Sequence, residues 1–157
     1  MGFIKGRGRI TLIIYTIGFT KKNAETFFSL INKSEADLLL DVRLNANSQL
    51  SGFAKKNDLP YFLYKLCDCQ YIHAERVAPT KKLLTDYHKG ITSWEEYELI
   101  YQKLYQQRDM KDYFLDLVGS KDKVILLCSE ATPERCHRRL LAEMLQRDLM
   151  NIEVKHL

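Results

Sequence analysis

Cysteine, histidine and arginine gather in one short segment of the chain. Cys128 ends an apolar run, and Cys136, His137 and Arg138 follow it closely. A thiolate is a nucleophile, an imidazole transfers protons near neutral pH, and a guanidinium binds carboxylates and phosphates. These residue types predict a site for an anionic ligand, with groups available for acid–base chemistry.

Other polar residues stand at the ends of apolar runs elsewhere in the sequence. They are Thr16 and Gly18 near the end of the first run, Asp41 and Arg43 at the end of the second, His73 at the end of the third, and Glu130 just after Cys128. Continuous apolar runs are typical of parallel strands, which bind ligands outside their carboxyl ends. We therefore expect these residues to share one site.

Two carboxyl groups are candidates for acid–base catalysis. Asp41 and Glu130 would act as general base and general acid if their surroundings hold them in different protonation states. The alternative is structural, with Asp41 paired to Arg43 and Glu130 anchoring Arg138. Strand-end acids of α/β domains serve both purposes, so the residues alone leave both interpretations open.

The cations and histidines also have two interpretations each. Arg43 and Arg138 would hold an anion through paired hydrogen bonds, or form internal salt bridges. Arg138 is favoured for the anion, because it is expected at the mouth of a helix. His73 and His137 would shuttle protons or be hydrogen-bonded core residues, and His137 is the stronger candidate for proton transfer.

The cysteines suggest two further kinds of chemistry. Cys128 invites comparison with cysteine phosphatases and rhodaneses, but it stands one residue too far from Arg135 for the phosphatase signature. A structural thiol is therefore preferred for Cys128, and Cys136 has the better setting for a lowered pKa. Zinc bound by these two cysteines with His137 and His73 is the metal alternative. Because the Cys-x-x-Cys hook is missing, no metal is predicted.

No organic cofactor is predicted either. Gly18 stands alone, and neither GxGxxG nor GxxxxGK[ST] occurs in the sequence. Those glycine-rich loops cradle the phosphates of dinucleotides and nucleoside triphosphates. Dinucleotide binding and P-loop chemistry are therefore not expected.

Five short apolar runs are predicted to form the sheet that positions these residues. They cover residues 11–16, 37–42, 70–73, 123–128 and 152–157. Segments with helical spacing lie between them, as parallel crossovers require. The expected fold class is α/β, a single three-layer Rossmann-like domain with a mostly parallel sheet of about five strands.

Start signals predict the helices of the crossovers. Thr20 is expected to cap the first helix, and Ser93 opens a capping-box pattern before an aromatic stripe that is expected in the core. Further helices are expected over 58–67, 81–88 and 108–118. The last helix is predicted to begin at Pro133 with Thr132 as its N-cap, which places Cys136 late in the first turn.

Length and composition indicate an ordinary globular domain. The 157 residues are 46% hydrophobic and 28% charged, which fits one domain over 1–157 with residues 1–10 as an N-terminal extension. The net charge of +4 is weakly basic, and its lysine pairs are scattered rather than clustered as in a dedicated nucleic-acid binder. Four cysteines without Cys-x-x-Cys spacing and no membrane-length apolar stretch favour a cytoplasmic protein without a membrane partner.

Several of these motifs, in this order, resemble the DUF488 family. The resemblance rests on Thr16-Ile17-Gly18, Asp41-Val42-Arg43, Tyr71-Ile72-His73, and most specifically Leu127-Cys128-x-Glu130 followed by Cys136-His137-Arg138. It extends from about Ile14 to the C-terminus. It implies a small α/β domain and the place of a site, but no particular reaction.

The sequence also departs from the family pattern. Phe19 stands where a histidine is common, Ala46 and Gln49 stand where proline and arginine are usual, and Val77-Ala78-Pro79 replaces a Leu-Gly-Gly. The chain thereby lacks a candidate acid–base group and a candidate cation. An activity of relatives is accordingly expected to be altered or absent here.

The function expected from these residues is hydrolysis or group transfer on an anionic substrate, such as a nucleotide or a nucleic-acid end. Asp41 and Glu130 would perform the acid–base steps, Arg43 and Arg138 would hold the anion, and His137 would assist. The remaining substrate-binding residues would be Thr16, Gly18, His73, Cys128 and Cys136. Two alternatives are a non-catalytic module that binds a nucleotide or an acidic partner, and a zinc-binding or cysteine-dependent enzyme.

Overall fold

Five parallel strands form one sheet within residues 10–157, the part of the chain that the computed structural model describes, apart from the side chains of 49–51. The strands are β1 (Leu12–Gly18), β2 (Leu38–Asp41), β3 (Gln70–His73), β4 (Lys123–Cys128) and β5 (Ile152–His156). Their order across the sheet is β3-β2-β4-β1-β5. The predicted N-terminal extension lies outside the described residues except for Ile10.

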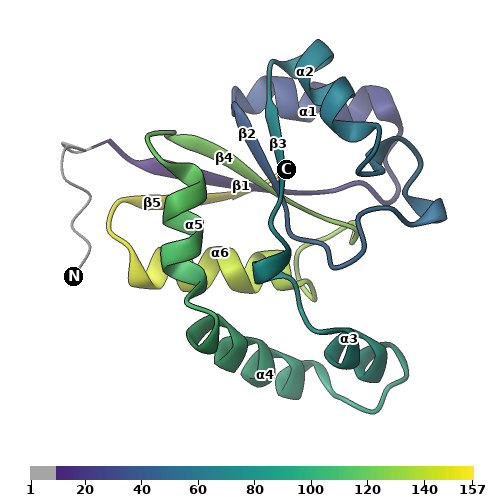
Figure 1. Ribbon diagram of the computed structural model, residues 1–157, viewed down its shortest axis with the longest axis vertical. Helices are drawn as coiled ribbons and strands as arrows, with labels where there is room; N and C mark the ends of the chain where they lie inside the picture. Colours follow the sequence, from purple (N-terminus) through teal and green to yellow (C-terminus); the bar gives the residue numbers. More distant parts are fainter. Residues whose placement is uncertain (1–9) are drawn as a thin grey trace.

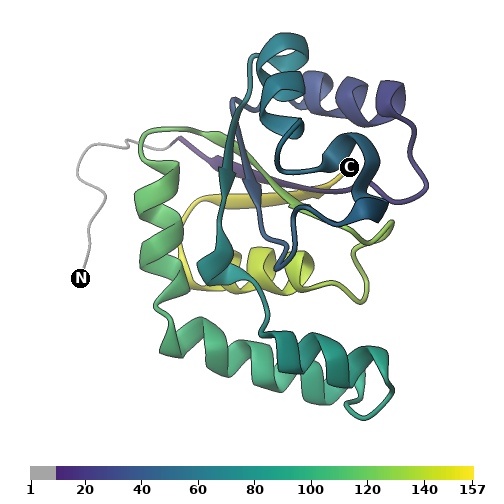
Figure 2. The ribbon, with the colours of Figure 1, turned by 45° about the vertical axis from the view of Figure 1, so that its right-hand side comes forward.

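Helices cover both faces of the sheet, which confirms the predicted α/β class with three layers (Figure 1). One face carries α1 (Ala24–Ser34) and α2 (Leu59–Cys67). The other face carries α3 (Lys81–His88), α4 (Trp94–Gln107), α5 (Met110–Val118) and α6 (His137–Asp148). In both ribbon views α6 lies between the sheet and α4 (Figure 2).

Alternating strand residues supply the two cores. In β2, Leu39 packs with α1 and α2, whereas Leu38 and Leu40 pack with the helices of the opposite face. All three are buried, as the continuous apolar run predicted. The aromatic stripe of α4 is core as well, because Tyr97, Tyr101 and Tyr105 are each at most 2% exposed.

The strand order creates a switch point at the carboxyl edge of the sheet. Strand β4 lies between β1 and β2 and leads into α6 on one face, whereas β1 and β2 lead into α1 and α2 on the other. A crevice forms where the loops after neighbouring strands lead to opposite faces of the sheet, and ligands of α/β proteins bind in this crevice. The ends of β1, β2 and β4 are therefore the place to look for a site.

Two predicted helix starts are wrong, and each differs for a tertiary reason. Helix α1 is capped by Asn23, whose Oδ1 accepts from the amide of Thr26 at 2.8 Å, while the Thr20 amide donates to the Ser129 carbonyl at 3.2 Å. Helix α6 begins at His137 with Cys136 as its N-cap, so Thr132 and Pro133 lie in the preceding loop. Cys136 is thus at the helix mouth rather than late in the first turn.

Strand β1 also extends beyond its predicted end, through Gly18. Thr16 and Gly18 are consequently strand residues, paired in register with Leu126 and Cys128 of β4. Among residues 10–157, no helix combines the length and apolarity needed to cross a bilayer.

Candidate functional site

Two polar clusters lie at the carboxyl edge of the sheet, on opposite faces. The ion-pair cluster consists of Asp41, Arg43 and Tyr71, on the face of α1 and α2. The thiol cluster consists of Cys128, Cys136, His137 and Arg138, on the face of α6. The predicted site residues are therefore not brought together in one group.

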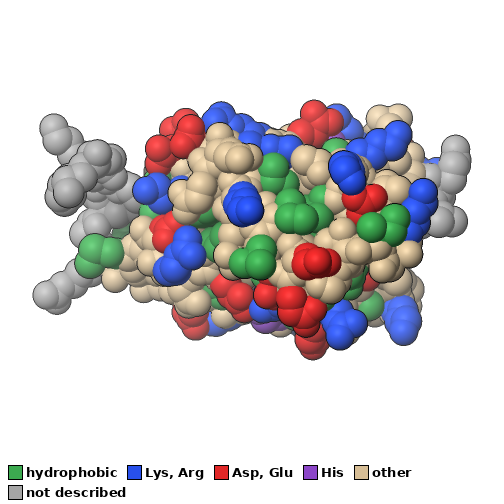
Figure 3. All heavy atoms as spheres, turned by 90° about the horizontal axis from the view of Figure 1, so that it is seen from below, with side chains coloured by type: hydrophobic (Ala, Val, Ile, Leu, Met, Phe, Trp, Pro, Cys, Tyr) green, Lys and Arg blue, Asp and Glu red, His purple; other side chains and the backbone are tan. Residues whose placement is uncertain are grey.

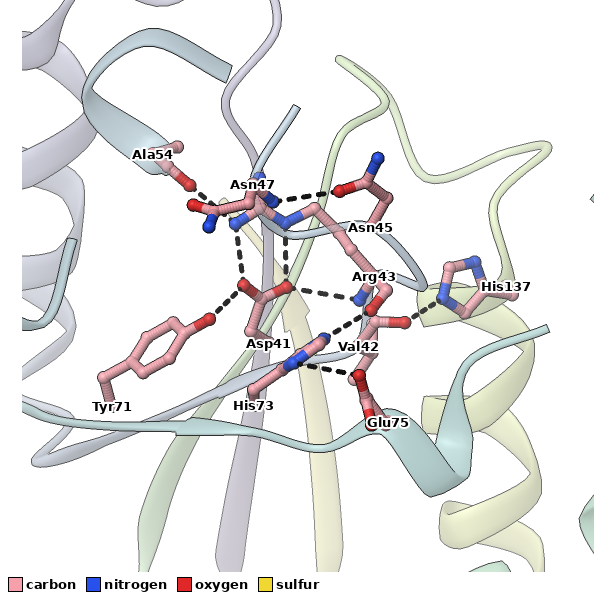
Figure 4. A network of polar contacts seen from close by, with 10 residues as sticks. All are labelled: Asp41, Val42, Arg43, Asn45, Asn47, Ala54, Tyr71, His73, Glu75 and His137. Carbon is pink, nitrogen blue, oxygen red and sulfur yellow. Dashed lines mark hydrogen bonds and ion pairs between the residues drawn. The ribbon is translucent and has the colours of Figure 1, made fainter. Parts of the chain in front are cut away.

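The ion-pair cluster is closed on itself (Figure 4). The Nε and Nη2 atoms of Arg43 donate to the two carboxylate oxygens of Asp41 at 2.8 and 2.7 Å, and the phenol of Tyr71 donates to Asp41 Oδ2 at 2.6 Å. Arg43 Nη2 also donates to the carbonyl of Ala54 at 2.6 Å, and the guanidinium lies 5.2 Å from the centroid of the Phe19 ring. Asp41 is completely buried and Arg43 is 3% exposed. Their alternative role as an internal salt bridge is the one the geometry displays.

The pKa shifts within this cluster have direct causes. Burial lowers the pKa of Arg43, but the hydrogen bonds to Asp41 and its negative charge outweigh burial, and the net shift is upward. Burial and the hydrogen bond to the Asp41 carboxylate raise the pKa of Tyr71 well above its usual value. Arg43 thus stays charged and Tyr71 stays a neutral donor, which is the state that satisfies the buried carboxylate.

His73 lies beside the ion-pair cluster without joining it. Its Nε2 is 2.8 Å from the carbonyl oxygen of Arg43, so Nε2 carries the proton and donates. Its Nδ1 lies 3.6 Å from a carboxylate oxygen of Glu75, longer than a good hydrogen bond. The ring is directed at the β2 end and not at the cysteines, so His73 is not part of the thiol cluster.

The thiol cluster is assembled by the end of β4 and the start of α6. Cys128 Sγ lies 3.8 Å from His137 Nδ1, and Cys136 forms a hydrogen bond with Cys128. Cys128, Cys136 and His137 are 6%, 2% and 5% exposed. One ligand atom from each of the three residues lies within 4.8 Å of the others. This grouping could hold one metal ion or present a thiolate next to an imidazole.

Two other elements fix the ring of His137. Its Nε2 lies 2.7 Å from the carbonyl oxygen of Val42, just after β2, so this nitrogen donates (Figure 4). The lone pair of Nδ1 then faces Cys128. The ring of Tyr101, from α4, meets the imidazole edge to face at 5.7 Å. The Tyr101 hydroxyl is held in turn by the carbonyl of Val77 at 2.6 Å. The tautomer and orientation of His137 therefore follow from β2 and α4 together.

The two thiols of the cluster differ in acidity. The hydrogen bond from Cys136 lowers the pKa of Cys128 well below its usual value, and the adjacent His137 lowers it further against the effect of burial. The same hydrogen bond, with burial, raises the pKa of Cys136 well above its usual value. Burial lowers the pKa of His137, but the neighbouring Cys128 thiolate outweighs it, and the pKa rises. These opposite shifts of the pKa make Cys128 the more acidic of the two thiols.

Arg138 is a buried cation whose guanidinium lies beside the thiols. Its Nη1 donates to the Glu130 carbonyl at 2.7 Å and lies 3.7 Å from Cys136 Sγ. The side chain is completely buried, and its Nε has no hydrogen-bond partner among the residues that the structure describes. The structure gives Arg138 no carboxylate partner within residues 10–157, so a negative charge at the thiol cluster would compensate it.

Gly18 makes this arrangement possible. A Cβ at residue 18 would lie 1.6 Å from the carbonyl oxygen of Glu130 and 3.1 Å from Arg138 Nη1. No side chain fits there, because the loop after β4 and the Arg138 guanidinium occupy the space. Gly18 thus positions the Glu130 backbone rather than a ligand.

Two predicted site residues lie apart from the thiols. The side chain of Glu130 is exposed, and only its backbone carbonyl anchors Arg138. The Thr16 hydroxyl lies 2.6 Å from Nδ1 of His156 on β5, two residues before Gly18 and deeper in the sheet. Neither the Glu130 side chain nor the Thr16 hydroxyl forms a hydrogen bond with Cys128.

Sequence reasoning gave no site role to Tyr71 or Tyr101. Tyr71 pairs with Leu39 in the register of β2 and β3, so the alternation of strand side chains puts it on the face of Asp41. The two-residue alternation of strand side chains could have predicted this position of Tyr71 from the sequence, once β2 and β3 were known to pair. Tyr101 was predicted to be core, and its contact with His137 depends on how α4 crosses α6.

Comparison with known proteins identifies one family. The family model described as "Domain of unknown function DUF488" matches residues 23–145. No curated protein and no solved structure matches the chain significantly. The matched range includes both clusters, and its description assigns no activity.

Proposed function

The chain belongs to the DUF488 family, and we propose that it is a cysteine-dependent enzyme that transfers or hydrolyses a group of an anionic ester. One observation carries the proposal. Cys128 Sγ lies 3.8 Å from Nδ1 of an imidazole whose other nitrogen donates to the Val42 carbonyl at 2.7 Å. A nucleophile, a base and a group that orients the base are the parts of nucleophilic catalysis.

The proposed reaction has two steps. His137 Nδ1 takes the thiol proton, and the Cys128 thiolate attacks the electrophilic atom of the ester, so that a bond to sulfur forms as the bond to the leaving oxygen breaks. The imidazolium gives its proton to that oxygen. In the second step water attacks the sulfur-bound group, gives a proton to the imidazole of His137, which is neutral again, and releases the thiolate. For group transfer an alcohol replaces water.

Two features support an anionic substrate. The helix α6 begins at His137, so its first amides have no partner within the helix and favour negative charge at its mouth. Arg138 adds a buried cation with an unpartnered Nε beside Cys136. Because Arg43 is bound to Asp41 and Ala54, Arg138 is our candidate for the anion and Arg43 a positioning residue.

A small substrate is favoured over a nucleic-acid strand. On the face that carries α3 and α4, basic and acidic side chains alternate around exposed hydrophobic ones (Figure 3). Strand binding usually uses a continuous basic groove, which this face does not present. We propose a nucleotide-sized anionic ester as the substrate class, because among the described residues the thiol cluster contains a single buried cation, Arg138.

The test is turnover of a panel of anionic nitrophenyl and nucleotide esters by the purified full chain. The Cys128→Ser variant is expected to lose at least about 100-fold in rate, because a hydroxyl is not ionised by this imidazole. Cys67→Ser is the matched control, since Cys67 lies on α2 with its thiol at the Phe28 carbonyl. Equal rates in the parent and Cys128→Ser would refute a role for this thiol.

A second variant separates an enzyme from a binding module. His137→Asn should reduce turnover while the substrate still raises the melting temperature, because ligands that bind only the native state stabilise it. Stabilisation of the parent by a nucleotide without any turnover would instead identify a non-catalytic module.

A further inference from the structure

We infer that Cys128, Cys136 and His137 form a binding site for one Zn²⁺ ion, with three protein ligands. Their ligand atoms lie within 4.8 Å of one another, and Cys128 Sγ lies 3.8 Å from His137 Nδ1. Zn–S and Zn–N bonds of about 2.3 and 2.0 Å place tetrahedral ligands about 3.5–3.8 Å apart. The cluster therefore needs only a small contraction to enclose the ion.

The imidazole is oriented as in a metal site. A histidine that binds zinc through one ring nitrogen usually donates its other N–H to a carbonyl or carboxylate. His137 donates from Nε2 to the Val42 carbonyl at 2.7 Å and turns Nδ1 toward the cysteines. The orienting partner, Val42, lies just after β2, a strand that supplies none of the three ligands.

The charge around the cluster favours deprotonated sulfur. Arg138 is completely buried, its Nη1 lies 3.7 Å from Cys136 Sγ, and its Nε is unpartnered among the described residues. Two neutral thiols would leave this cation uncompensated in the protein interior. Two thiolates and Zn²⁺ together carry no net charge, so an anion in the open fourth position of the metal would compensate Arg138.

The donor atoms select the metal. Two sulfurs and one imidazole nitrogen suit zinc, whereas Mg²⁺ and Ca²⁺ require oxygen ligands. No fourth Cys, His, Asp or Glu of residues 10–157 belongs to this group. His73, the fourth ligand of the zinc alternative, donates to the Arg43 carbonyl instead. Three protein ligands leave the fourth position for water or an anion, as in catalytic rather than structural zinc sites.

Zinc binding and the proposed thiol reaction exclude each other, because both use the sulfur of Cys128. Zinc would use the sulfur lone pair with which Cys128 attacks an ester. The metal-bound protein is therefore expected to react with iodoacetamide at Cys128 at least tenfold more slowly than the metal-free protein. The inference does not depend on the proposed reaction, because binding is measured without substrate.

The experiment is titration of the chelator-treated full chain with Co²⁺, which reports tetrahedral thiolate coordination by its absorption. We expect one equivalent of Co²⁺ to produce sulfur-to-cobalt charge-transfer bands, and one equivalent of Zn²⁺ to remove them. Cys128→Ser, Cys136→Ser and His137→Asn should each weaken binding by at least about tenfold. Circular dichroism confirms that each variant is folded.

Cys67→Ser and Cys69→Ser are the matched controls. Their thiols face the carbonyls of Phe28 and Gln70, away from the cluster, and burial raises the pKa of Cys69 to about 12. Both variants should keep full affinity. Absence of charge-transfer bands, or stoichiometric binding that survives in Cys128→Ser/Cys136→Ser, would overturn the site. Binding without turnover refutes only the proposed enzyme, and turnover without binding refutes only the zinc site.

Discussion

The two polar clusters each contain a buried arginine but differ in how completely their polar groups are hydrogen-bonded. In the ion-pair cluster, both oxygens of Asp41 accept from Arg43, and Tyr71 donates to one of them. In the thiol cluster, Arg138 is just as buried, yet its Nε has no partner among the described residues. The buried charges of the ion-pair cluster are therefore paired with each other. In the thiol cluster, a bound ligand could still pair with the Arg138 guanidinium.

This difference distinguishes residues that build the fold from residues that could act on a ligand. A buried ion pair that is fully hydrogen-bonded costs much to break, but it offers no free donor or acceptor. A buried cation beside two thiols is stabilised by an added anion. The chemistry of this protein is therefore expected on the α6 face of the sheet.

The largest expected effect comes from breaking the ion-pair cluster. Arg43→Met leaves the Asp41 carboxylate buried without its cation, and it should lower the free energy of unfolding by about 3–5 kcal/mol. Urea denaturation measures the loss. The Asp41→Leu/Arg43→Met double variant, which removes both charges, should lose much less than the sum of the single variants. A loss below about 1 kcal/mol in Arg43→Met would mean that this cluster is not the structural one.

Loss of the phenol should have a smaller effect. Tyr71→Phe removes a 2.6 Å hydrogen bond to the Asp41 carboxylate, for which we expect a loss of about 1.5–3 kcal/mol in the free energy of unfolding. Tyr64→Phe is the control, because Tyr64 is 65% exposed on α2. Equal denaturation midpoints for the two variants would show that Asp41 does not need this donor.

The next prediction concerns the support of the thiol cluster. Gly18→Ala places a Cβ 1.6 Å from the Glu130 carbonyl, which must move, at a cost of about 1–3 kcal/mol. Since that carbonyl holds Arg138, Co²⁺ affinity should fall as well. Gly90→Ala serves as the comparison for Co²⁺ affinity only, because a Cβ there meets nothing within 4 Å but the positive φ of 71° strains any side chain. Unchanged Co²⁺ affinity in Gly18→Ala would show that the loop after β4 does not support the thiol cluster.

The smallest effect is a pH dependence of the ion-pair cluster. Burial and the Asp41 hydrogen bond raise the pKa of Tyr71 in the folded state, so folding retains a proton that the unfolded phenol loses above about pH 10. This contribution to stability is complete below that pH and decreases as the pH rises further. The stability difference between the parent and Tyr71→Phe should therefore stay constant from about pH 7 to 9 and shrink above about pH 10. A stability difference between the parent and Tyr71→Phe that stays constant above about pH 10 would contradict the raised pKa of Tyr71.

The sequence by itself determined the buried strands β1, β2 and β4, because their continuous apolar runs are typical of a sheet covered on both faces. Runs 70–73 and 123–128 match β3 and β4 residue for residue. The capping box at Ser93 is also confirmed, since both of its hydrogen bonds form within four neighbouring residues. Such features depend on contacts close in the chain, and a local pattern specifies them.

Tertiary structure decided how the polar residues at the strand ends are divided. Asp41 and Cys128 both end strands, but strand alternation and helix placement direct them to opposite faces. The start of α6 moved from Pro133 to His137, because the loop before it must bring the Glu130 carbonyl over Gly18 to Arg138. The partners of His137 come from β2, β4 and α4, and contacts between residues so far apart in the chain arise only when the sheet and its helices are packed together.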